Sequence, residues 1–215
     1  ALMPEYMTLG LDHTDEGIVS ADAVETLLAE RCDVLAVGPG LGRSAGAKTL
    51  VRTLVKQATV PIVLDADGLN AFTDDAAGLV GREGQSLIIT PHAGEMARLI
   101  GSTVDYVQTN RMEVARELAT SRSVYVILKG ARTVVATPEG AVLINVTGNP
   151  GMATGGTGDV LTGLVAGWLA QLADAERACV LGVFLHGMAG DLAAVEQGQG
   201  AVIASDLVDK IGPAV

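Results

Sequence analysis

The sequence predicts an α/β fold built on a largely parallel sheet. Short, continuously apolar segments alternate with longer stretches of helical periodicity, and each apolar segment runs directly into a polar or glycine-rich loop. Continuously apolar runs are typical of strands that helices cover on both faces. The length of 215 residues and the 49% share of apolar residues suit one domain with a sizeable core.

Four segments have the composition of buried parallel strands, rich in Val, Ile and Leu. They span residues 33–37, 61–64, 86–89 and 124–128. The stretches between them have the spacing of helices, with apolar residues three and four positions apart. These expected helices span residues 44–58, 93–100 and 110–120.

The pattern changes after Lys129. Two β-rich segments, 133–137 and 141–146, flank Pro138-Glu139-Gly140, which predicts a β-hairpin with a tight turn. Helices over 157–172 and 175–195 follow, and the second is apolar nearly all round, so we expect it to be buried. The apolar runs in these helices are too short to predict a membrane span.

Charge and composition exclude several functions. The chain has 25 acidic and 14 basic residues, a net charge of −11, and only 3% aromatic residues. Nucleic-acid binders need a basic surface and stacking side chains, so we expect no nucleic-acid partner. A small phosphorylated ligand stays compatible, because backbone N–H groups can hold it.

The cysteines and the amino-terminal residues bear on location. Cys32 and Cys179 lie in apolar, helix-like contexts and match no metal-ligand spacing, so we expect two buried thiols in a reducing compartment. The first residues do not have the charged and apolar regions of a signal peptide. We therefore expect a cytoplasmic protein without a membrane segment.

The glycine-rich stretch 147–159 is the most informative motif. It leads into the expected helix at 157–172, and a helix amino terminus offers free N–H groups to an anion. We interpret Gly155, Gly156, Thr157 and Gly158 as a phosphate-binding loop, with Asp159 as a general base beside it. The alternative is that Thr157 caps the helix and Asp159 only complements its dipole. The lysine of a P-loop is absent.

Two further motifs follow expected strands. Lys129, at the end of 124–128, is placed to contact a nucleotide phosphate, or else is an exposed cation at the hairpin. In the segment 90–95 we expect Thr90 to cap a helix that begins at Pro91. His92 would then lie in the first turn, facing the crevice. His13 and His186 have no such context, and we interpret them as structural or surface residues.

Acidic and glycine-rich loops follow the first two strands. Asp65 and Asp67 predict a water-mediated Mg²⁺ contact or an orienting role, with a simple helix-capping turn as the alternative. The loop 38–42 does not match a dinucleotide-binding fingerprint, although it can approach a ligand. Ligands of open α/β sheets bind outside the carboxyl ends of the strands, where all these motifs fall.

Taken together, the motifs resemble those of a known family. They are VGPGLG (37–42), LDADGLN (64–70), TPHAGE (90–95), LKGART (128–133) and NPGMATGGTGDVLTG (149–163). In this order they resemble the ADP/ATP-dependent NAD(P)H-hydrate dehydratases, a carbohydrate-kinase-related family of the ribokinase-like superfamily. The resemblance runs from Pro4-Glu5 to Asp206. It implies a three-layer sheet with helices on both faces and a hairpin near the nucleotide.

The resemblance also implies roles for particular residues. Lys129, Gly130, Ala131, Arg132, Thr133 and Gly158 would bind the adenine nucleotide, Gly42 and His92 the hydrated nicotinamide nucleotide, and Asp159 would be the catalytic base. From the glycine-rich loop we add Gly155, Gly156 and Thr157 to the nucleotide site. From the strand-end loops we add Glu95, Asp67 and Asn70 to the substrate site, which Asp159 also contacts.

The implied reaction is the repair of NADHX and NADPHX, the hydrated forms of NADH and NADPH. ADP, or ATP, would be the phosphoryl donor, with Mg²⁺ as cofactor. A hydroxyethylthiazole or hydroxymethylpyrimidine kinase is the alternative enzyme, and a non-catalytic nucleotide-binding module is the alternative from another class. A kinase would release a stable phosphoester.

The resemblance carries three expectations about organisation. Residues 1–215 would form a single ribokinase-like domain that lacks the family's amino-terminal strand and glycine-rich loop. The family also implies a homo-oligomer, often a tetramer. In bifunctional members an NAD(P)HX epimerase domain is fused upstream.

Overall fold

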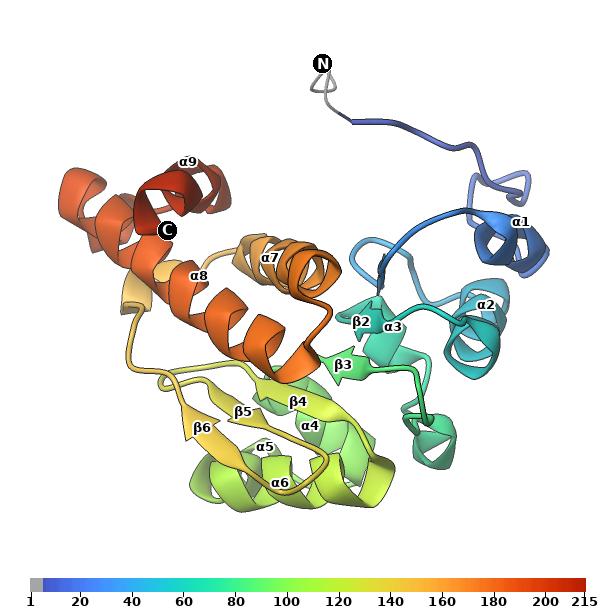
Figure 1. Ribbon diagram of the computed structural model, residues 1–215, viewed down its shortest axis with the longest axis horizontal. Coiled ribbons are helices and arrows are strands. Elements are labelled where there is room, and N and C mark those ends of the chain that lie inside the picture. Colours follow the sequence, from blue (N-terminus) through green and yellow to red (C-terminus); the bar gives the residue numbers. More distant parts are fainter. Residues whose placement is uncertain (1–5) are drawn as a thin grey trace.

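The computed structural model describes residues 6–215, so Pro4 and Glu5 lie outside the described part of the chain. Six strands form one sheet in the order β1-β2-β3-β4-β5-β6 (Figure 1). Their bounds are β1 Leu35–Val37, β2 Ile62–Leu64, β3 Leu87–Ile89, β4 Tyr125–Leu128, β5 Val134–Ala136 and β6 Val142–Ile144. The first four strands are parallel, and β5 and β6 pair antiparallel, which confirms the mostly parallel sheet and the hairpin.

Longer helices connect the strands, as the periodicity predicts. Those confirmed are α2 Ala45–Gln57, α4 Ala93–Ile100, α6 Arg111–Arg122, α7 Thr157–Leu172 and α8 Ala175–Gln197. Four helices had no prediction: α1 Ala23–Ala29, α3 Asp67–Asn70, α5 Val104–Thr109 and α9 Ala204–Ala214. Short 3-10 helices lie at η1 Ala76–Gly78, η2 Pro150–Met152 and η3 Gln199–Ala201.

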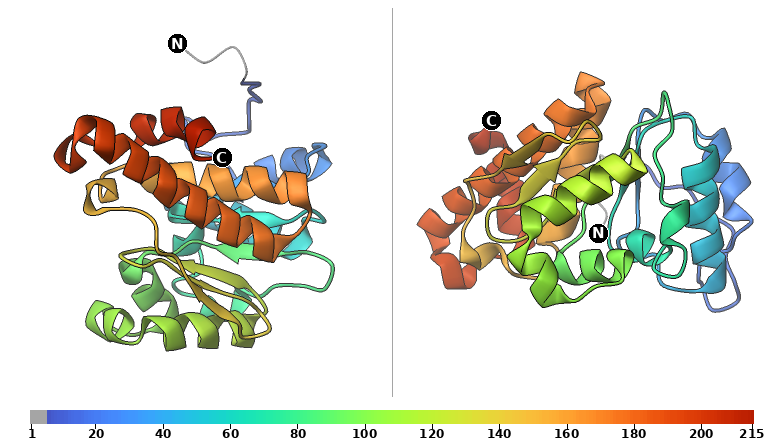
Figure 2. Two further views of the ribbon diagram at one scale, coloured as in Figure 1. Left: turned by 60° about the vertical axis from the view of Figure 1, so that its left-hand side comes forward. Right: turned by 90° about the horizontal axis from the view of Figure 1, so that it is seen from below.

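The two faces of the sheet bury alternate residues of each strand. Val63, Ile88 and Ile127 pack with α7 and α8. Their strand neighbours, such as Ile62 and Ile89, pack with α2, α4 and α6 in the larger core. Figure 2 shows the resulting three layers, with α7 and α8 on one side of the sheet and α4, α5 and α6 on the other. This is the doubly covered sheet that the apolar strands predict.

Helix α8 is longer than its sequence pattern indicated. It has 23 residues and is the one helix of residues 6–215 long and apolar enough to span a membrane, with a mean hydropathy of 1.7 over its most apolar window. Length and composition are the only grounds for a span, and core helices of folded domains meet the same criteria. Half of that window is buried inside the protein, where α8 packs against α7 and α9.

Three local expectations were wrong. His92, not Thr90, caps α4, because the chain becomes helical only at Ala93. The alternative reading that Thr157 caps α7 fails, since Gly156 holds that position in a left-handed conformation. Cys32 is only partly buried, whereas Cys179 is fully buried and its pKa is raised by that burial.

The loop ends of β2, β3 and β4 meet at one edge of the sheet. Strand register aligns Leu64 with Ile89, and backbone bonds continue the pattern from Thr90 to Leu64 and from Lys129 to Pro91. The residues that follow these strands are thereby brought side by side. Two expectations stay predictions. One is that residues 1–215 form a single domain, and the other is that the family's amino-terminal strand and glycine-rich loop are lacking.

Candidate active site

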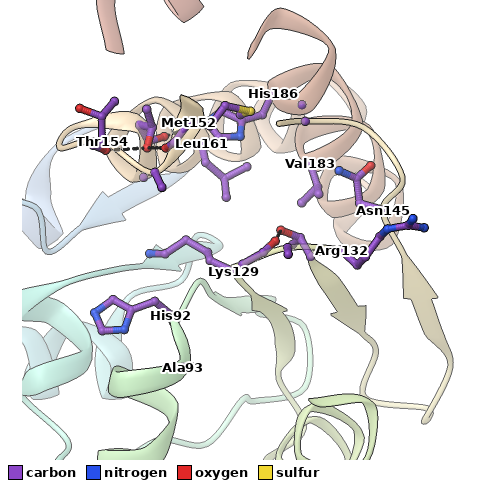
Figure 3. Close-up of a pocket in the computed structure, with 18 of the residues that line it drawn as sticks. His92, Ala93, Lys129, Arg132, Asn145, Met152, Thr154, Leu161, Val183 and His186 are labelled. Carbon is purple, nitrogen blue, oxygen red and sulfur yellow. Dashed lines mark hydrogen bonds between the residues drawn. The ribbon is translucent and has the colours of Figure 1, made fainter. Parts of the chain in front are cut away.

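A large pocket opens at the carboxyl ends of the parallel strands. Its volume is about 1020 Å³, at the upper end of the ~300–1,000 Å³ typical of small-molecule sites. Figure 3 shows His92 and Lys129 on the sheet side of the pocket, with Thr154, Leu161 and His186 on the opposite side. The loop after β4 and the loop between β6 and α7 form the rest of the wall.

The amino terminus of α7 forms one wall. Gly156 adopts φ +88°, which turns the chain into the helix at Thr157. The Thr157 hydroxyl donates to the backbone oxygens of Met152 (2.8 Å) and Thr154 (3.0 Å) and so fixes the loop before the helix. The first N–H groups of a helix have no acceptor within it, so this turn is suited to an anion.

Lys129 supplies a positive charge beside this helix start. Its Nζ lies 2.5 Å from Asp65 Oδ1 and 3.9 Å from Glu95 Oε2. A Cβ atom built on Gly158 would lie 3.6 Å from the same Nζ. The ammonium group therefore lies against the first turn of α7, where its charge and the free N–H groups have the same sign of attraction for an anion.

His92 is fixed by the helix that it caps. Its Nδ1 accepts hydrogen bonds from the backbone N–H groups of Gly94 (2.9 Å) and Glu95 (3.2 Å). Glu95 Oε2 in turn accepts from the His92 backbone N–H at 2.8 Å, which completes a capping box. Because Nδ1 is an acceptor, the proton of the neutral ring is on Nε2. Nε2 lies 3.5 Å from Glu95 Oε1 on a ring that lines the pocket.

Asp159 is the free carboxylate of the pocket. It lies in the first turn of α7, is exposed, and lines the cavity. Within the described residues its side chain makes no hydrogen bond or ion pair with the protein. A carboxylate that no donor occupies can accept a proton from a ligand hydroxyl.

The loop after β4 has an unusual backbone. Gly130 adopts φ +142° and Arg132 φ +57°, so the chain turns sharply before β5. Arg111 of α6 secures the start of this loop, because its Nη2 donates to the backbone oxygens of Leu128 (2.8 Å) and Lys129 (3.3 Å). Arg111 was not among the predicted site residues, because it lies 17 residues from Leu128 along the chain.

Helix α8 holds the opposite wall. Asp191 accepts from the Gly148 backbone N–H and from Asn149 Nδ2, both at 2.9 Å. Gly187 leaves room for the loop, since a Cβ there would come within 2.1 Å of the Thr147 hydroxyl. His186, which the sequence analysis took for a structural or surface residue, lines the pocket and binds the Thr157 carbonyl oxygen at 2.8 Å.

A second polar cluster lies beside the pocket. Asp67 accepts hydrogen bonds from the Gly42 backbone N–H (3.0 Å), Arg43 Nε (3.2 Å) and Asn70 Nδ2 (3.1 Å). Burial alone would raise the pKa of Asp67, but these hydrogen bonds outweigh it and hold the pKa below its ordinary value. Of the predicted site residues, Gly42, Asp67, Asn70 and Gly155 are not among those that line the pocket.

The carboxylates of the pocket do not form a metal site on their own. Residues 6–215 contain no group of three or more His, Cys, Asp or Glu side chains placed to hold a metal ion. Asp65 is engaged by Lys129, and Glu95 by His92. The donor set fits an ion that arrives with a phosphorylated ligand, since Mg²⁺ usually combines few carboxylates with substrate phosphates.

The fold and the pocket define an α/β protein that is built to bind an anionic small molecule. A family model described as NAD(P)H-hydrate dehydratase matches residues 1–213, so the chain belongs to the NAD(P)H-hydrate dehydratase family. The chain is 49% identical over 207 residues to the bifunctional NAD(P)H-hydrate repair enzyme Nnr of Moorella thermoacetica, with 95% of this chain and 39% of that protein covered. It therefore spans about two fifths of that relative.

Shorter relatives and solved structures agree with this assignment. The ADP-dependent (S)-NAD(P)H-hydrate dehydratase of Neisseria meningitidis is 40% identical over 191 residues, which cover 87% of this chain and 64% of that protein. The Bacillus subtilis ADP/ATP-dependent NAD(P)H-hydrate dehydratase, co-crystallised with ATP and Mg²⁺, superposes with a TM-score of 0.77 at 31% identity, covering 90% of this chain and 69% of that one. A hydroxyethylthiazole kinase from Pyrococcus horikoshii shares the ribokinase-like fold, at a TM-score of 0.66 and 16% identity.

Proposed function

We propose that the protein dehydrates (6S)-NADHX and (6S)-NADPHX to NADH and NADPH, with ADP as phosphoryl donor and AMP and phosphate as products. The observation that carries the proposal is the meeting of Asp159, Lys129 and the start of α7 in one pocket. Family membership and the names of the relatives support the same reaction. A small-molecule kinase is the weaker alternative, because the chain resembles the hydroxyethylthiazole kinase in fold alone.

The nucleotide is assigned to the wall formed by the β4–β5 loop and α7. Lys129, Gly130, Ala131, Arg132 and Thr133 would bind it together with Gly156, Thr157 and Gly158, and all of these residues line the pocket. Gly155, between two lining residues, would take part through the shape of the loop. The terminal phosphate would lie at the amino end of α7, between its N–H groups and Lys129 Nζ.

The hydrated nicotinamide ring is assigned to the side of His92 and Glu95. His92 would donate from Nε2 to the substrate, and Glu95 would hold His92 in place through the capping box. Gly42, Asp67 and Asn70 form the neighbouring hydrogen-bonded cluster and would bind a more distant part of the same dinucleotide. A volume of about 1020 Å³ suits two ligands that meet at Asp159 better than one small ligand.

Asp159 is the proposed catalytic base. It would take the proton from the C6 hydroxyl while that oxygen attacks the terminal phosphorus of ADP, and AMP would leave with the electrons of the broken P–O bond. The new C6–O–phosphate bond then breaks with its electron pair on phosphate, and loss of a C5 proton restores the double bond. Phosphorylation is required because hydroxide is a poor leaving group.

Magnesium is proposed as a cofactor that is held mainly by the nucleotide phosphates. Asp159 is the pocket carboxylate that no described residue engages, so it could contact the ion directly or through water. When bound, the ion would offset phosphate charge during transfer. Orientation of the phosphate would still come from this chain, through Lys129 and the first turn of α7.

The test is a product analysis on the full-length protein with NADHX and ADP. Recovery of the NADH absorbance band together with equimolar AMP and phosphate is the expected result. A stable phosphorylated NADHX without NADH would identify a kinase instead. Consumption of neither ligand would reject both enzyme proposals in favour of a binding module.

Three wider properties follow from family membership as proposals. The protein would be a cytoplasmic homo-oligomer, a tetramer in the simplest case, which sedimentation analysis tests. Its partners would be the small molecules NADHX, NADPHX and ADP, with no nucleic acid or membrane. A fused NAD(P)HX epimerase domain would correspond to the bifunctional relatives.

A further inference from the structure

Asp65 is a buried carboxylate that no part of the proposed mechanism uses. It follows β2 and is 1% exposed. Its Oδ1 accepts from the Ala66 backbone N–H at 2.8 Å and from Lys129 Nζ at 2.5 Å, and its Oδ2 accepts from the Thr162 hydroxyl at 2.8 Å. A buried charge is costly unless it is paired and hydrogen-bonded, and here both oxygens are engaged.

The three partners of Asp65 come from separate parts of the fold. Lys129 ends β4, and Thr162 lies in the second turn of α7, 97 residues from Asp65 along the chain. Asp65 therefore joins the edge of the sheet to the helix whose amino terminus forms the anion site. A Cβ built on Gly158 would lie 3.7 Å from Asp65 Oδ2 and 3.6 Å from Lys129 Nζ, so both groups lie against the first turn of α7.

The Lys129 ammonium group has two carboxylates within reach. Glu95 Oε2 is 3.9 Å from Nζ, and it already accepts the His92 backbone N–H. Asp65 is much nearer, and it holds the ammonium group against the first turn of α7. Thr162 fixes the orientation of the Asp65 carboxylate, and this orientation lets Asp65 bind the Lys129 ammonium group.

The backbone at Asp65 adds to the same arrangement. Ala66 adopts φ +47° and ψ −118°, a strained conformation for an L-residue that favours glycine. The Ala66 N–H points at Asp65 Oδ1 in this conformation. Such strain persists where the surrounding contacts determine the geometry. At this position those contacts include the Asp65 carboxylate and the Asn70 backbone N–H, which donates to the Ala66 carbonyl oxygen at 3.1 Å.

We propose that Asp65, held by Thr162, is the positioning residue that places the Lys129 ammonium group at the amino terminus of α7, ready for the terminal phosphate of a nucleotide. The identity of the ligand as a nucleotide rests on the proposed function. The placement of Lys129 by Asp65 does not depend on that function, so each claim can be refuted without the other.

A measurement without ligand tests the placement. The chain has four lysines, so the ammonium signals of ¹⁵N-lysine-labelled protein are few, and Lys129→Arg identifies the one from Lys129. A hydrogen-bonded ammonium group exchanges its protons slowly enough to be observed. We expect a Lys129 signal in the unaltered protein that disappears in Asp65→Asn and in Thr162→Val but is retained in Thr162→Ser. A Lys129 signal unchanged in Asp65→Asn would overturn the proposal.

A double-mutant cycle tests the consequence for binding, with ADP affinity measured by calorimetry. Asp65→Asn and Lys129→Met should each weaken ADP binding by about tenfold or more, as expected for a charge-assisted hydrogen bond. The double variant should bind no worse than Lys129→Met alone, because Asp65 acts through Lys129. Losses that multiply would show that Asp65 acts independently and would overturn the proposal.

Thr162 provides the matched control for folding. Thr162→Val keeps the shape of a buried side chain and Thr162→Ser keeps the hydroxyl, so similar melting temperatures with restored ADP affinity only in Thr162→Ser support positioning. Equal affinities in the two variants contradict it. If the unaltered protein binds ADP with this coupling but does not convert NADHX, the proposed function fails while the role of Asp65 stands.

Discussion

His186 of α8 donates a hydrogen bond from Nε2 to the carbonyl oxygen of Thr157, the first residue of α7, at 2.8 Å. A carbonyl oxygen only accepts, so Nε2 carries the proton. Burial is the largest influence on the pKa of His186 and lowers it below the ordinary value of 6.5, while the bond to Thr157 acts in the opposite direction. The folded protein therefore protonates this ring only at a lower pH than the unfolded chain does.

The first prediction is that the free energy of unfolding declines as the pH falls below about 6.5. In that range unfolded His186 takes up a proton and folded His186 does not, so the unfolded state binds more protons and is favoured. The loss is at most about 1.4 kcal/mol per pH unit and ends at the folded-state pKa. Denaturant unfolding at several pH values measures it.

His186→Gln is the comparison for this prediction, because glutamine keeps a donor but does not titrate near neutral pH. Its unfolding free energy should depend less on pH than that of the unaltered protein. His13→Gln, at an exposed histidine, should leave the dependence unchanged. Equal pH dependence in the unaltered protein and His186→Gln would contradict the prediction.

The second prediction concerns Asp159. Asp159→Asn should lower kcat by a factor of about 10²–10⁴, the usual contribution of a general base, and leave ADP affinity nearly unchanged. The side chain is exposed and makes no hydrogen bond or ion pair with other described residues, so the fold should not suffer. Glu176→Gln, at an exposed carboxylate in the first turn of α8, is the control and should retain kcat. Substantial turnover by Asp159→Asn would mean that another group is the base.

The third prediction compares two glycines in neighbouring helices. Gly187→Ala places a methyl group 2.1 Å from the Thr147 hydroxyl and 2.7 Å from the Thr147 carbonyl carbon, so it should destabilise the protein by about 1–3 kcal/mol. Gly167→Ala adds the same group where nothing lies within 4 Å, and should stabilise α7 by roughly 0.5–1 kcal/mol.

Thermal unfolding and ADP titration distinguish these two variants. Gly187→Ala should also weaken ADP binding, because the displaced residue adjoins the loop that Asp191 holds. If both variants had the same melting temperature, the close approach of α8 to Thr147 would be refuted.

The fourth prediction concerns the cluster around Asp67. Asp67→Asn replaces a carboxylate that accepts from Gly42, Arg43 and Asn70, so the loop at Gly42 should loosen. We expect the KM for NADPHX to rise about tenfold, the equivalent of one charged hydrogen bond, with little change in ADP affinity. Asp74→Asn, at an exposed carboxylate paired with Lys48, should leave both constants unchanged. A rise in both KM values for Asp67→Asn would place this residue at the nucleotide instead.

The sequence was sufficient to predict the sheet because its strands are continuously apolar and short. The same regularity predicted that Lys129, His92 and Asp159 converge, since the ends of parallel strands meet at one edge. The error at the start of α4 has a physical cause. Thr90 has the side chain of a common cap, but the backbone stays extended through His92, which caps the helix in its place.

The supporting contacts could not be predicted because they join residues that are distant along the chain. Asp191 meets Gly148 at a separation of 43 residues, and Thr162 meets Asp65 at 97. No local pattern distinguishes Arg111 from other helix arginines until α6 packs beside β4. The family motifs predicted the residues that we propose contact the ligands. The residues that hold them in place were identified only in the structure.

The pocket walls come from loops after β2, β3 and β4 and from α7 and α8, which together span most of the described chain. Loss of any one of these elements would remove part of the pocket wall. A bound nucleotide would consequently act on folding by mass action, adding about 2.7 kcal/mol at a free concentration one hundred times its Kd. The lifetime of this protein in the cell would then follow the supply of the nucleotide that we propose it consumes.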